Sequence, residues 1–288
     1  MSFKFTIENP MPPVWMMYPN ISQYSIGWRM GYGESYKWDL ADWKKTLTTE
    51  EISTYQEMFP PPTFWREYYN EDYEFEDIEE YECGCVQLWS KNGEMKYTID
   101  ALIKNHENLQ YLFFWKPGIN EKDKSCLGQW QLSNFEVDID DYTCAEQYMM
   151  AEKARLFEDK EIEEQIMHTA DPKTMKSLGK NVRGFDQTLW DNAKYSIVLN
   201  GNYYKFAQNK EMRDFLLSTC DKILVEASPL DAIWGIGLGE DNPKAHNPTT
   251  WRGQNILGFA LMEVRDDLRQ VYKNYNKINW EQLQNYLK

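Results

Sequence analysis

The sequence lacks several features that would place the protein in particular classes. No apolar run approaches the roughly 18 residues that a membrane-spanning helix requires, and the start of the chain has no charged and apolar segments of a signal peptide. The five cysteines are an odd number for a disulfide framework, and the single close pair, Cys83 and Cys85, has no second pair to complete a zinc site. We therefore expect a cytoplasmic protein with reduced thiols.

Metal-ligand patterns are also missing. The sequence has 3 histidines, and none has a carboxylate or cysteine at ligand spacing; they are His106, His168 and His246. No Ser, His and Asp arrangement indicates a hydrolytic triad. We expect no metal site and no other cofactor.

Positive charge is scarce as well. Lys and Arg number 31 against 46 Asp and Glu, which gives a formal charge of −15. An acidic surface repels nucleic-acid backbones at long range, although a local basic pocket could still hold a nucleotide. Residues 67–82 carry a large share of the acidic side chains and no basic one. This run is either a solvated linker or a docking surface for a basic protein partner.

The amino-acid composition changes along the chain. With 288 residues, of which 42% are hydrophobic and 15% aromatic, it can bury one large core or two modest ones. Residues 1–85 are rich in Tyr, Trp and Pro, so we predict an N-terminal region there and a second domain over 86–288. Within 18–36, aromatic residues and Arg29 could line a ligand pocket, or they could form a small aromatic core.

Hydrophobic periodicity predicts a mostly helical α+β fold with a small β-sheet. Strands at 86–89 and 96–99 would flank an Asn92-Gly93 hairpin turn, and a further strand is expected at 111–115. A buried strand is predicted at 223–225. Helices are predicted at 144–157, 160–169, 187–200, 210–219 and 255–275, and another should begin at Asp171-Pro172 and end at Gly179.

A first candidate for chemistry lies on the helix predicted over 144–157. Glu146 and Lys153 are seven residues apart, which is two helical turns, so their side chains project from nearly the same face. A carboxylate and an amine could thus address one pocket. The alternative is structural: Thr143 followed by Glu146 is also the pattern of a capping box, and Lys153 could be a solvated helix lysine.

A second candidate is the glycine-rich segment that begins at Asp231 and precedes the last long helix. Backbone amides of such a loop, the positive end of a helix and the guanidinium of Arg252 would suit a phosphate. The alternative is that Asp231 is a turn residue after Pro229. Asn209, between two predicted helices, is most simply a cap.

Taken together, the segments resemble the NADAR family, which includes YbiA-like N-glycosidases of riboflavin-pathway intermediates and enzymes that remove ADP-ribose from guanine. The resemblance covers residues 109–268. Its elements stand in order along the chain: Leu132-Ser133-Asn134-Phe135, Glu146-x-Tyr148, Lys153-Ala154, Leu178-Gly179, Trp190-Asp191, Lys205-Phe206-x-Gln208-Asn209, Leu224-Val225-Glu226, Asp231-x2-Trp234-Gly235 and Asn255-x-Leu257-Gly258.

The resemblance implies an N-glycosidase acting on a ribosyl or ADP-ribosyl nucleobase conjugate. The residues that it implies as catalytic are Glu146, Lys153 and Asp231. Those expected to bind substrate are Asn134, Tyr148, Trp190, Trp234, Gly235, Arg252 and Asn255. The sequence departs from the family pattern at Gln147, where many relatives have histidine, and at Gln254, where a lysine is expected.

The chemistry of N-glycoside cleavage explains why such residues are needed. Positive charge develops at the anomeric carbon and negative charge on the departing base, so a site needs an anion beside the sugar and a proton donor for the nitrogen. Glu146 could stabilise the cation or deprotonate water, with Asp231 as a second carboxylate. Alternatively, Lys153 could form a Schiff base with the opened sugar. A binding module for ADP-ribose or an NAD derivative, or an antitoxin-type interaction protein, are the other functions considered.

Overall fold

The computed structural model describes residues 5–65, 68–70, 95–104, 109–118 and 123–286. Among these, residues up to 70, residues 137–140 and residues from 267 onward form one compact unit, and the other described residues form a second. The predicted division at residue 85 lies outside the described residues, as do residues 71–82 of the acidic run. The grouping of the C-terminal segment with the N-terminal unit was not expected.

Hydrogen bonds explain why the C-terminal segment belongs with the N-terminal unit. The backbone amide and hydroxyl of Thr63 donate to the carboxylate of Asp267, with the hydroxyl 2.9 Å from Oδ1. The side-chain amide of Asn274 donates to the carbonyl of Met58 at 2.9 Å. These bonds satisfy polar groups that the unit would otherwise bury unpaired.

The first unit is built around aromatic rings. Trp15 is buried and contacts the rings of Trp65, Tyr68 and Tyr69 edge-on. Its helices are α1 (Val14–Met17), α2 (Tyr32–Lys44), α3 (Thr49–Met58) and α11 (Trp280–Tyr286). Within the aromatic segment 18–36, the ring of Tyr18 packs against Trp28, Tyr32 and Tyr36, and Arg29 is exposed. The rings of this segment therefore cluster around the half-buried Tyr18, with Trp28 and Tyr36 buried and Tyr32 exposed.

Two small sheets lie among the helices. Strand β1 (Tyr111–Phe114) pairs in parallel with β4 (Ile223–Glu226), with Tyr111 opposite Ile223 and Phe114 opposite Glu226. Strands β2 (Phe135–Val137) and β3 (Asp140–Tyr142) form the second sheet. The predicted strands at 111–115 and 223–225 are confirmed. The strand predicted at 96–99 is wrong, because α4 (Ile99–Lys104) begins there; its expected partner and the hairpin turn lie outside the described residues.

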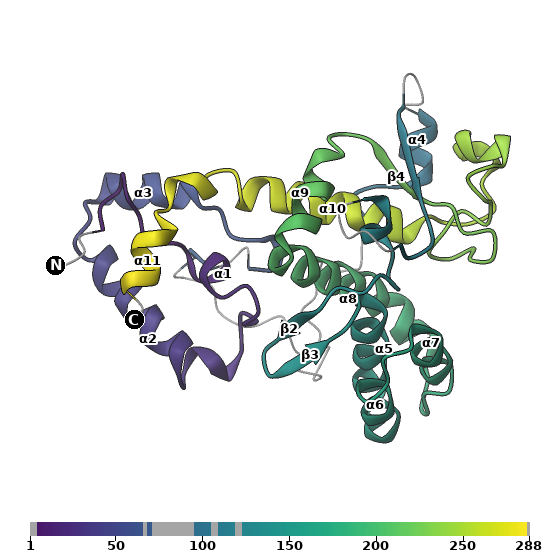
Figure 1. Ribbon diagram of the computed structural model, residues 1–288, viewed down its shortest axis with the longest axis horizontal. Coiled ribbons are helices and arrows are strands. Elements are labelled where there is room, and N and C mark those ends of the chain that lie inside the picture. Colours follow the sequence, from purple (N-terminus) through teal and green to yellow (C-terminus); the bar gives the residue numbers. More distant parts are fainter. Residues whose placement is uncertain (1–4, 66–67, 71–94, 105–108, 119–122, 287–288) are drawn as a thin grey trace. The chain divides into compact units, whose positions relative to one another are not determined.

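The second unit is mostly helical, as predicted. Helix α5 packs on the three helices that follow it, and Figure 1 shows them grouped together. Among the described residues, no helix is long and apolar enough to cross a membrane. The helices from α5 onward, up to the last long one, are α5 (Ala145–Leu156), α6 (Lys160–Met167), α7 (Pro172–Lys180), α8 (Gln187–Gln208), α9 (Lys210–Ser218) and α10 (Ile256–Val271).

Local sequence signals explain most of these boundaries. The Asp171 side chain accepts hydrogen bonds from the Lys173 and Thr174 amides, so the predicted cap of α7 is confirmed. Gly179 does not end that helix. It lies inside α7, where an added Cβ would come within 2.0 Å of the sulfur of Met150. The lack of a side chain at Gly179 thus leaves room for the Met150 side chain of α5 against α7.

Helix α10 is fastened to strand β4 by the side chain of Asn255, which is fully buried. Its Oδ1 accepts from the amide of Glu226 at 3.0 Å, and its Nδ2 donates to the carbonyl of Leu224 at 2.9 Å. The helix also lies against the strand backbone at Gly258, where an added Cβ would come within 2.1 Å of the Leu224 carbonyl oxygen. The end of β4 and the start of α10 therefore form one rigid junction.

This junction predicts the effect of Gly258→Ala. Because the strand carbonyl occupies the space that a methyl group would need, the substitution should lower the free energy of unfolding by about 2 kcal/mol or more, the scale of an overpacked core. Urea denaturation would measure it. Gly239→Ala is the control, since a Cβ at Gly239 meets nothing within 4 Å. Equal free energies of unfolding for the two variants would contradict the close packing of α10 on the β4 backbone at Gly258.

Candidate active site

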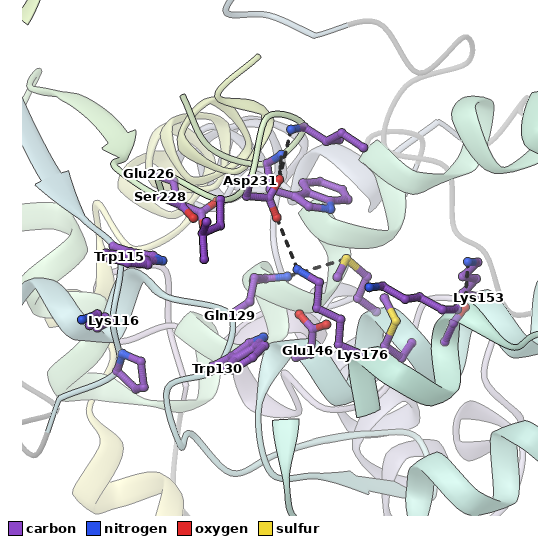
Figure 2. Close-up of a pocket in the computed structure, with 18 of the residues that line it drawn as sticks. Trp115, Lys116, Gln129, Trp130, Glu146, Lys153, Lys176, Glu226, Ser228 and Asp231 are labelled. Atoms are coloured by element: carbon purple, nitrogen blue, oxygen red, sulfur yellow. Dashed lines mark hydrogen bonds and ion pairs between the residues drawn. The ribbon is translucent and has the colours of Figure 1, made fainter. Parts of the chain in front are cut away.

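A pocket of about 570 Å³ lies entirely within the second unit. Its walls come from the segment after β1, from α5, α7 and α8, and from the end of β4 with the loop that follows (Figure 2). The pocket is lined by aromatic rings together with both acidic and basic side chains. The lining residues are Trp115, Lys116, Pro117, Gln129, Trp130, Glu146, Met149, Met150, Lys153, Lys176, Gly179, Lys180, Trp190, Glu226, Ser228, Leu230, Asp231, Ile233 and Trp234.

Glu146 stands in the first turn of α5 and is 3% exposed. Its Oε1 is buried and has no hydrogen-bond partner among the described residues. Burial raises the pKa of the carboxyl group to about 7, against the lowering effects of the Lys176 ammonium and a hydrogen bond with Trp130. A buried carboxyl group with a raised pKa, facing a pocket, is a candidate functional residue.

The capping interpretation of Glu146 is wrong. The Thr143 amide and hydroxyl donate to Oε1 of Gln147, at 2.8 and 2.9 Å, so the neighbouring residue closes the start of α5. The Nε2 of Gln147 donates to the carbonyl of Ile166 at 3.0 Å and also to those of Met167 and Thr169 at the end of α6. Gln147 therefore holds two helices together and leaves Glu146 free to face the pocket.

Asp231 serves both as a turn residue and as a pocket residue. Its Oδ1 accepts hydrogen bonds from the amides of Ile233 and Trp234, at 3.0 and 2.9 Å. Its Oδ2 is 3.3 Å from Nζ of Lys176, which reaches across from α7. In Figure 2 the Lys176 side chain runs from beside Glu146 toward Asp231. The two interpretations of Asp231 from the sequence, as a turn residue and as a pocket residue, are thus compatible.

Sequence reasoning missed four charged residues of this pocket, Lys116, Lys176, Lys180 and Glu226. Glu226 is the last residue of β4, and its Oε2 is buried without a hydrogen-bond partner among the described residues. Burial raises the pKa of this carboxyl group to about 8, and Asp231 adds to the effect. A carboxylate directly after a buried apolar strand was the available signal for Glu226. Lys176 carried no signal, because single lysines on helices are ordinarily solvated.

Lys153 also lines the pocket, but at its margin. Its Nζ donates to the carbonyl of Gly179 at 2.8 Å and lies over the rings of Phe185 and Trp190, 4.4 and 5.3 Å from their centroids. Burial lowers the pKa of the amine. Figure 2 shows Lys153 to one side, away from Asp231.

Five of the ten residues predicted for the site line this pocket: Glu146, Lys153, Trp190, Asp231 and Trp234. Tyr148 is not among the lining residues, because its ring is buried against Phe135 and Tyr142. Asn134 and Arg252 are exposed and also absent from the pocket wall. These three residues therefore lie outside the wall of this pocket, and their contact with a substrate stays a prediction.

Gly235 and Asn255 support the wall of the pocket, Asn255 through its side-chain hydrogen bonds to β4 and Gly235 through its lack of a side chain. A Cβ at Gly235 would come within 2.7 Å of the Glu226 carbonyl oxygen, so only glycine lets the loop pass this close to β4. The loop carbonyls of Ala232, Ile233 and Trp234 accept the amides of residues 254, 256 and 257 at the start of α10. These amides are therefore engaged within the fold, and phosphate binding by Arg252 stays a prediction.

No group of three or more His, Cys, Asp or Glu side chains suitable for a metal ion occurs among the residues that the structure describes.

Comparison with known proteins identifies the family. The model of the NADAR domain matches residues 113–269, more than half of the chain. The chain belongs to the NADAR family.

Several NADAR-family relatives have names that state an activity. An N-glycosidase of Acanthamoeba polyphaga mimivirus is 40% identical over 169 residues, which cover 57% of this chain and 99% of that protein. The N-glycosidase YbiA of Escherichia coli is 28% identical over a match that covers 54% of this chain and 86% of YbiA. The solved NMR structure of E. coli YbiA matches with a TM-score of 0.45 at 26% identity, covering 55% of this chain and 84% of that one. The named relatives support an N-glycosidase of this family.

The buried charge of Glu146 predicts a stability change. Because the pKa of this carboxyl group is raised on folding, its ionisation disfavours the folded state increasingly as the pH rises from 4.5 to about 7. Glu146→Gln removes that charge, so at pH 8 it should increase the free energy of unfolding by about 1 to 3 kcal/mol. Urea denaturation at pH 8 and pH 5 would measure the difference, which should shrink at the lower pH. A variant less stable than the parent at pH 8 would show that Glu146 is a structural residue.

Proposed function

We propose that this chain hydrolyses the C1–N bond of a ribosyl or ADP-ribosyl nucleobase conjugate. The observation that carries the proposal is the buried Glu146 carboxylate with an unpartnered oxygen in a pocket lined by aromatic rings and lysines. An anion in such a place stabilises positive charge at the anomeric carbon far better than one in water does. The same carboxylate can take a proton from an attacking water.

The pocket walls also suit the rest of such a substrate. Four tryptophans, at positions 115, 130, 190 and 234, offer surfaces on which a base or ribose can stack. Four lysines, at positions 116, 153, 176 and 180, give a local positive charge in a chain of net charge −15. This combination favours a phosphorylated substrate. ADP-ribosylated guanine in nucleic acid and a ribosylaminopyrimidine phosphate of the riboflavin pathway both meet the description.

A purely binding role fits the pocket less well. Recognition of a nucleotide requires donors, acceptors and stacking surfaces, but not a buried carboxylate that lacks a partner. Keeping Glu146 at this position destabilises the folded protein whenever its carboxyl group is ionised. Groups of this kind are typical of sites that carry out chemistry.

Two routes differ in the part that Lys153 plays. In the first, water attacks the anomeric carbon and Glu146 takes its proton. In the second, Lys153 forms a Schiff base with the opened sugar, which its lowered amine pKa assists. The hydrogen bond from Nζ to the Gly179 carbonyl, and the ring contacts around it, hold the amine at the margin of the pocket. This placement favours the water route.

The direct test is to incubate the protein with ADP-ribosylated guanosine DNA and, separately, with a ribosylaminouracil phosphate. We expect release of the free base from one of them, identified by mass spectrometry. Glu146→Gln should lower kcat by about 100-fold or more, because an amide can neither balance the cation nor accept a proton. Glu240→Gln is the control, since this exposed carboxylate pairs with Lys124 at the surface and lies outside the pocket wall. Near-normal kcat in Glu146→Gln would remove Glu146 from the reaction.

The pH dependence of the reaction follows from the same group. Because the Glu146 carboxyl group must be ionised to act, and its pKa is raised to about 7, kcat/KM of the parent should rise with pH through about 7. Glu146→Gln should lose this acidic limb, and Glu240→Gln should keep it. An acidic limb near pH 4.5 in the parent would contradict the assignment.

Borohydride trapping separates the two routes. If water attacks directly, sodium borohydride added during turnover leaves no sugar attached to the protein. If a Schiff base forms, the parent gains the mass of the reduced sugar adduct, Lys153→Ala does not, and the exposed control Lys173→Ala does. We expect no adduct. An adduct located at Lys153 by peptide mass spectrometry would establish the covalent route.

A further inference from the structure

We propose that Glu226 is the proton donor to the departing nitrogen in the N-glycosidase reaction. The inference rests on the proposed function and adds a catalytic residue to it. In the step that we assign, the C1–N bond breaks and its electron pair stays on the nitrogen, which takes the proton of the Glu226 carboxyl group. Water bonds to C1 and its proton passes to Glu146. Both carboxyl groups then return to their starting state by exchanging a proton with solvent, and the net change is addition of one water.

The placement of Glu226 suits this role. It ends strand β4, whereas Glu146 begins helix α5, so the two carboxyl groups belong to different walls of one pocket. Figure 2 shows them apart, with Glu226 beside Ser228 and Glu146 beside Trp130. A substrate between them would have one carboxyl group for the sugar side and one for the base side, as paired carboxyl groups serve glycosidases.

The buried oxygen of Glu226 is the second observation. Its Oε2 has no hydrogen-bond partner among the described residues, although it is closed off from solvent. A buried polar atom without a partner costs free energy that a purely structural residue would avoid. The cost is explained if the bound substrate supplies the missing partner. A nitrogen of a leaving base is an acceptor that a protonated carboxyl group can serve.

The charges around Glu226 keep its proton in place. Burial raises its pKa first, the carboxylates of Asp231 and Glu146 raise it further, and the Lys176 ammonium lowers it. The Nζ of Lys176 also lies 3.3 Å from Oδ2 of Asp231, and this pairing limits how far Lys176 lowers the pKa of Glu226. The remaining charged side chains on the pocket wall are Lys116, Lys153 and Lys180.

Both carboxyl groups have pKa values raised toward neutrality, to about 7 for Glu146 and about 8 for Glu226. The pair can therefore hold a single proton there, which leaves one carboxylate to act as the base and one carboxylic acid to act as the donor. Asp231 is a poorer candidate for the donor, because its oxygens already accept from two amides and lie beside the Lys176 ammonium.

Two residues that the sequence marked as substrate contacts position Glu226. The side chain of Asn255 accepts from the Glu226 amide at 3.0 Å, and the amide of Ile236 donates to the Glu226 carbonyl at 3.0 Å. Any side chain at Gly235 would collide with that carbonyl. The backbone of Glu226 is thus fixed on both sides, which is the precision that a proton donor needs.

The test compares Glu226→Gln, Glu226→Asp and the surface control Glu240→Gln with the parent, on whichever of the two substrates the parent hydrolyses. The amide in Glu226→Gln keeps the shape of the side chain but has no acidic proton, so kcat should fall about 100-fold or more with little change in KM. The parent's kcat/KM should fall as the pH rises through about 8. This alkaline limb should vanish in Glu226→Gln, while the acidic limb near 7 remains. Glu226→Asp should recover part of the rate, together with an alkaline limb.

The outcomes separate the two proposals. If the parent releases no base from either substrate, the proposed function fails. If the parent is active and Glu226→Gln keeps kcat within about 3-fold or retains the alkaline limb, only the role of Glu226 is overturned. Should Glu226→Gln fail to fold, as judged by its circular dichroism, Glu226→Asp decides. A rate and pH profile for Glu226→Asp equal to the parent's, with no alkaline limb in either, would overturn the assignment.

Discussion

The pair of hydrogen bonds made by the Asn255 side chain is the interaction on which the candidate site depends. The buried side-chain amide of Asn255 joins strand β4 to the start of α10. It accepts a hydrogen bond from the backbone amide of Glu226 and donates one to the carbonyl of Leu224. Asn255 itself has a φ of 54°, a conformation that asparagine tolerates better than most residues. The loop between the strand and the helix is then folded back so that its carbonyls meet the helix amides. Glu226 and Asp231 reach the same wall of the pocket because of this arrangement.

The wall formed by the segment around Gln129 is held in a comparable way by helix α8. Asn202 donates to the Gln129 side chain at 3.0 Å, and the fully buried Lys205 donates to the Gly128 carbonyl at the same distance. Burial lowers the pKa of the Lys205 amine to about 8. Polar side chains from the inside of a long helix thus fix the backbone that presents Gln129 and Trp130. The pocket is lined by groups whose supports lie in the core, so its shape does not depend on surface loops alone.

Much of the fold could be predicted from the sequence, because its signals are local. Caps such as Asp171, the 3.6-residue periodicity of α5 and the apolar run of β4 act over a few residues. The boundaries that failed depended on tertiary contacts. Gly179 has the composition of a helix end but serves the packing of α7 on α5, and Ile99 belongs to a helix although the preceding turn signal favoured a hairpin.

The candidate site could also be predicted in part, where its residues belong to local patterns. The helical spacing of Glu146 and Lys153 and the Asp231 loop are short-range patterns, and all three of these residues line the pocket. Tyr148 and Asn134 were assigned by resemblance, and the packing of the ring of Tyr148 on its neighbours could not be predicted from the sequence. Lys176 and Glu226 were missed for the opposite reason. Lys176 has no local signal, and the carboxylate that follows the apolar run of β4 gains its meaning only when the folded chain brings it into the pocket that Glu146 also lines.

Gln147 has a consequence for how the protein responds to acidity. This amide links the start of α5 to the end of α6 by accepting from Thr143 and donating to three carbonyls. A carboxamide does not gain or lose a proton in the range where histidine titrates. The link that Gln147 makes between α5 and α6 therefore does not change with proton concentration near neutrality.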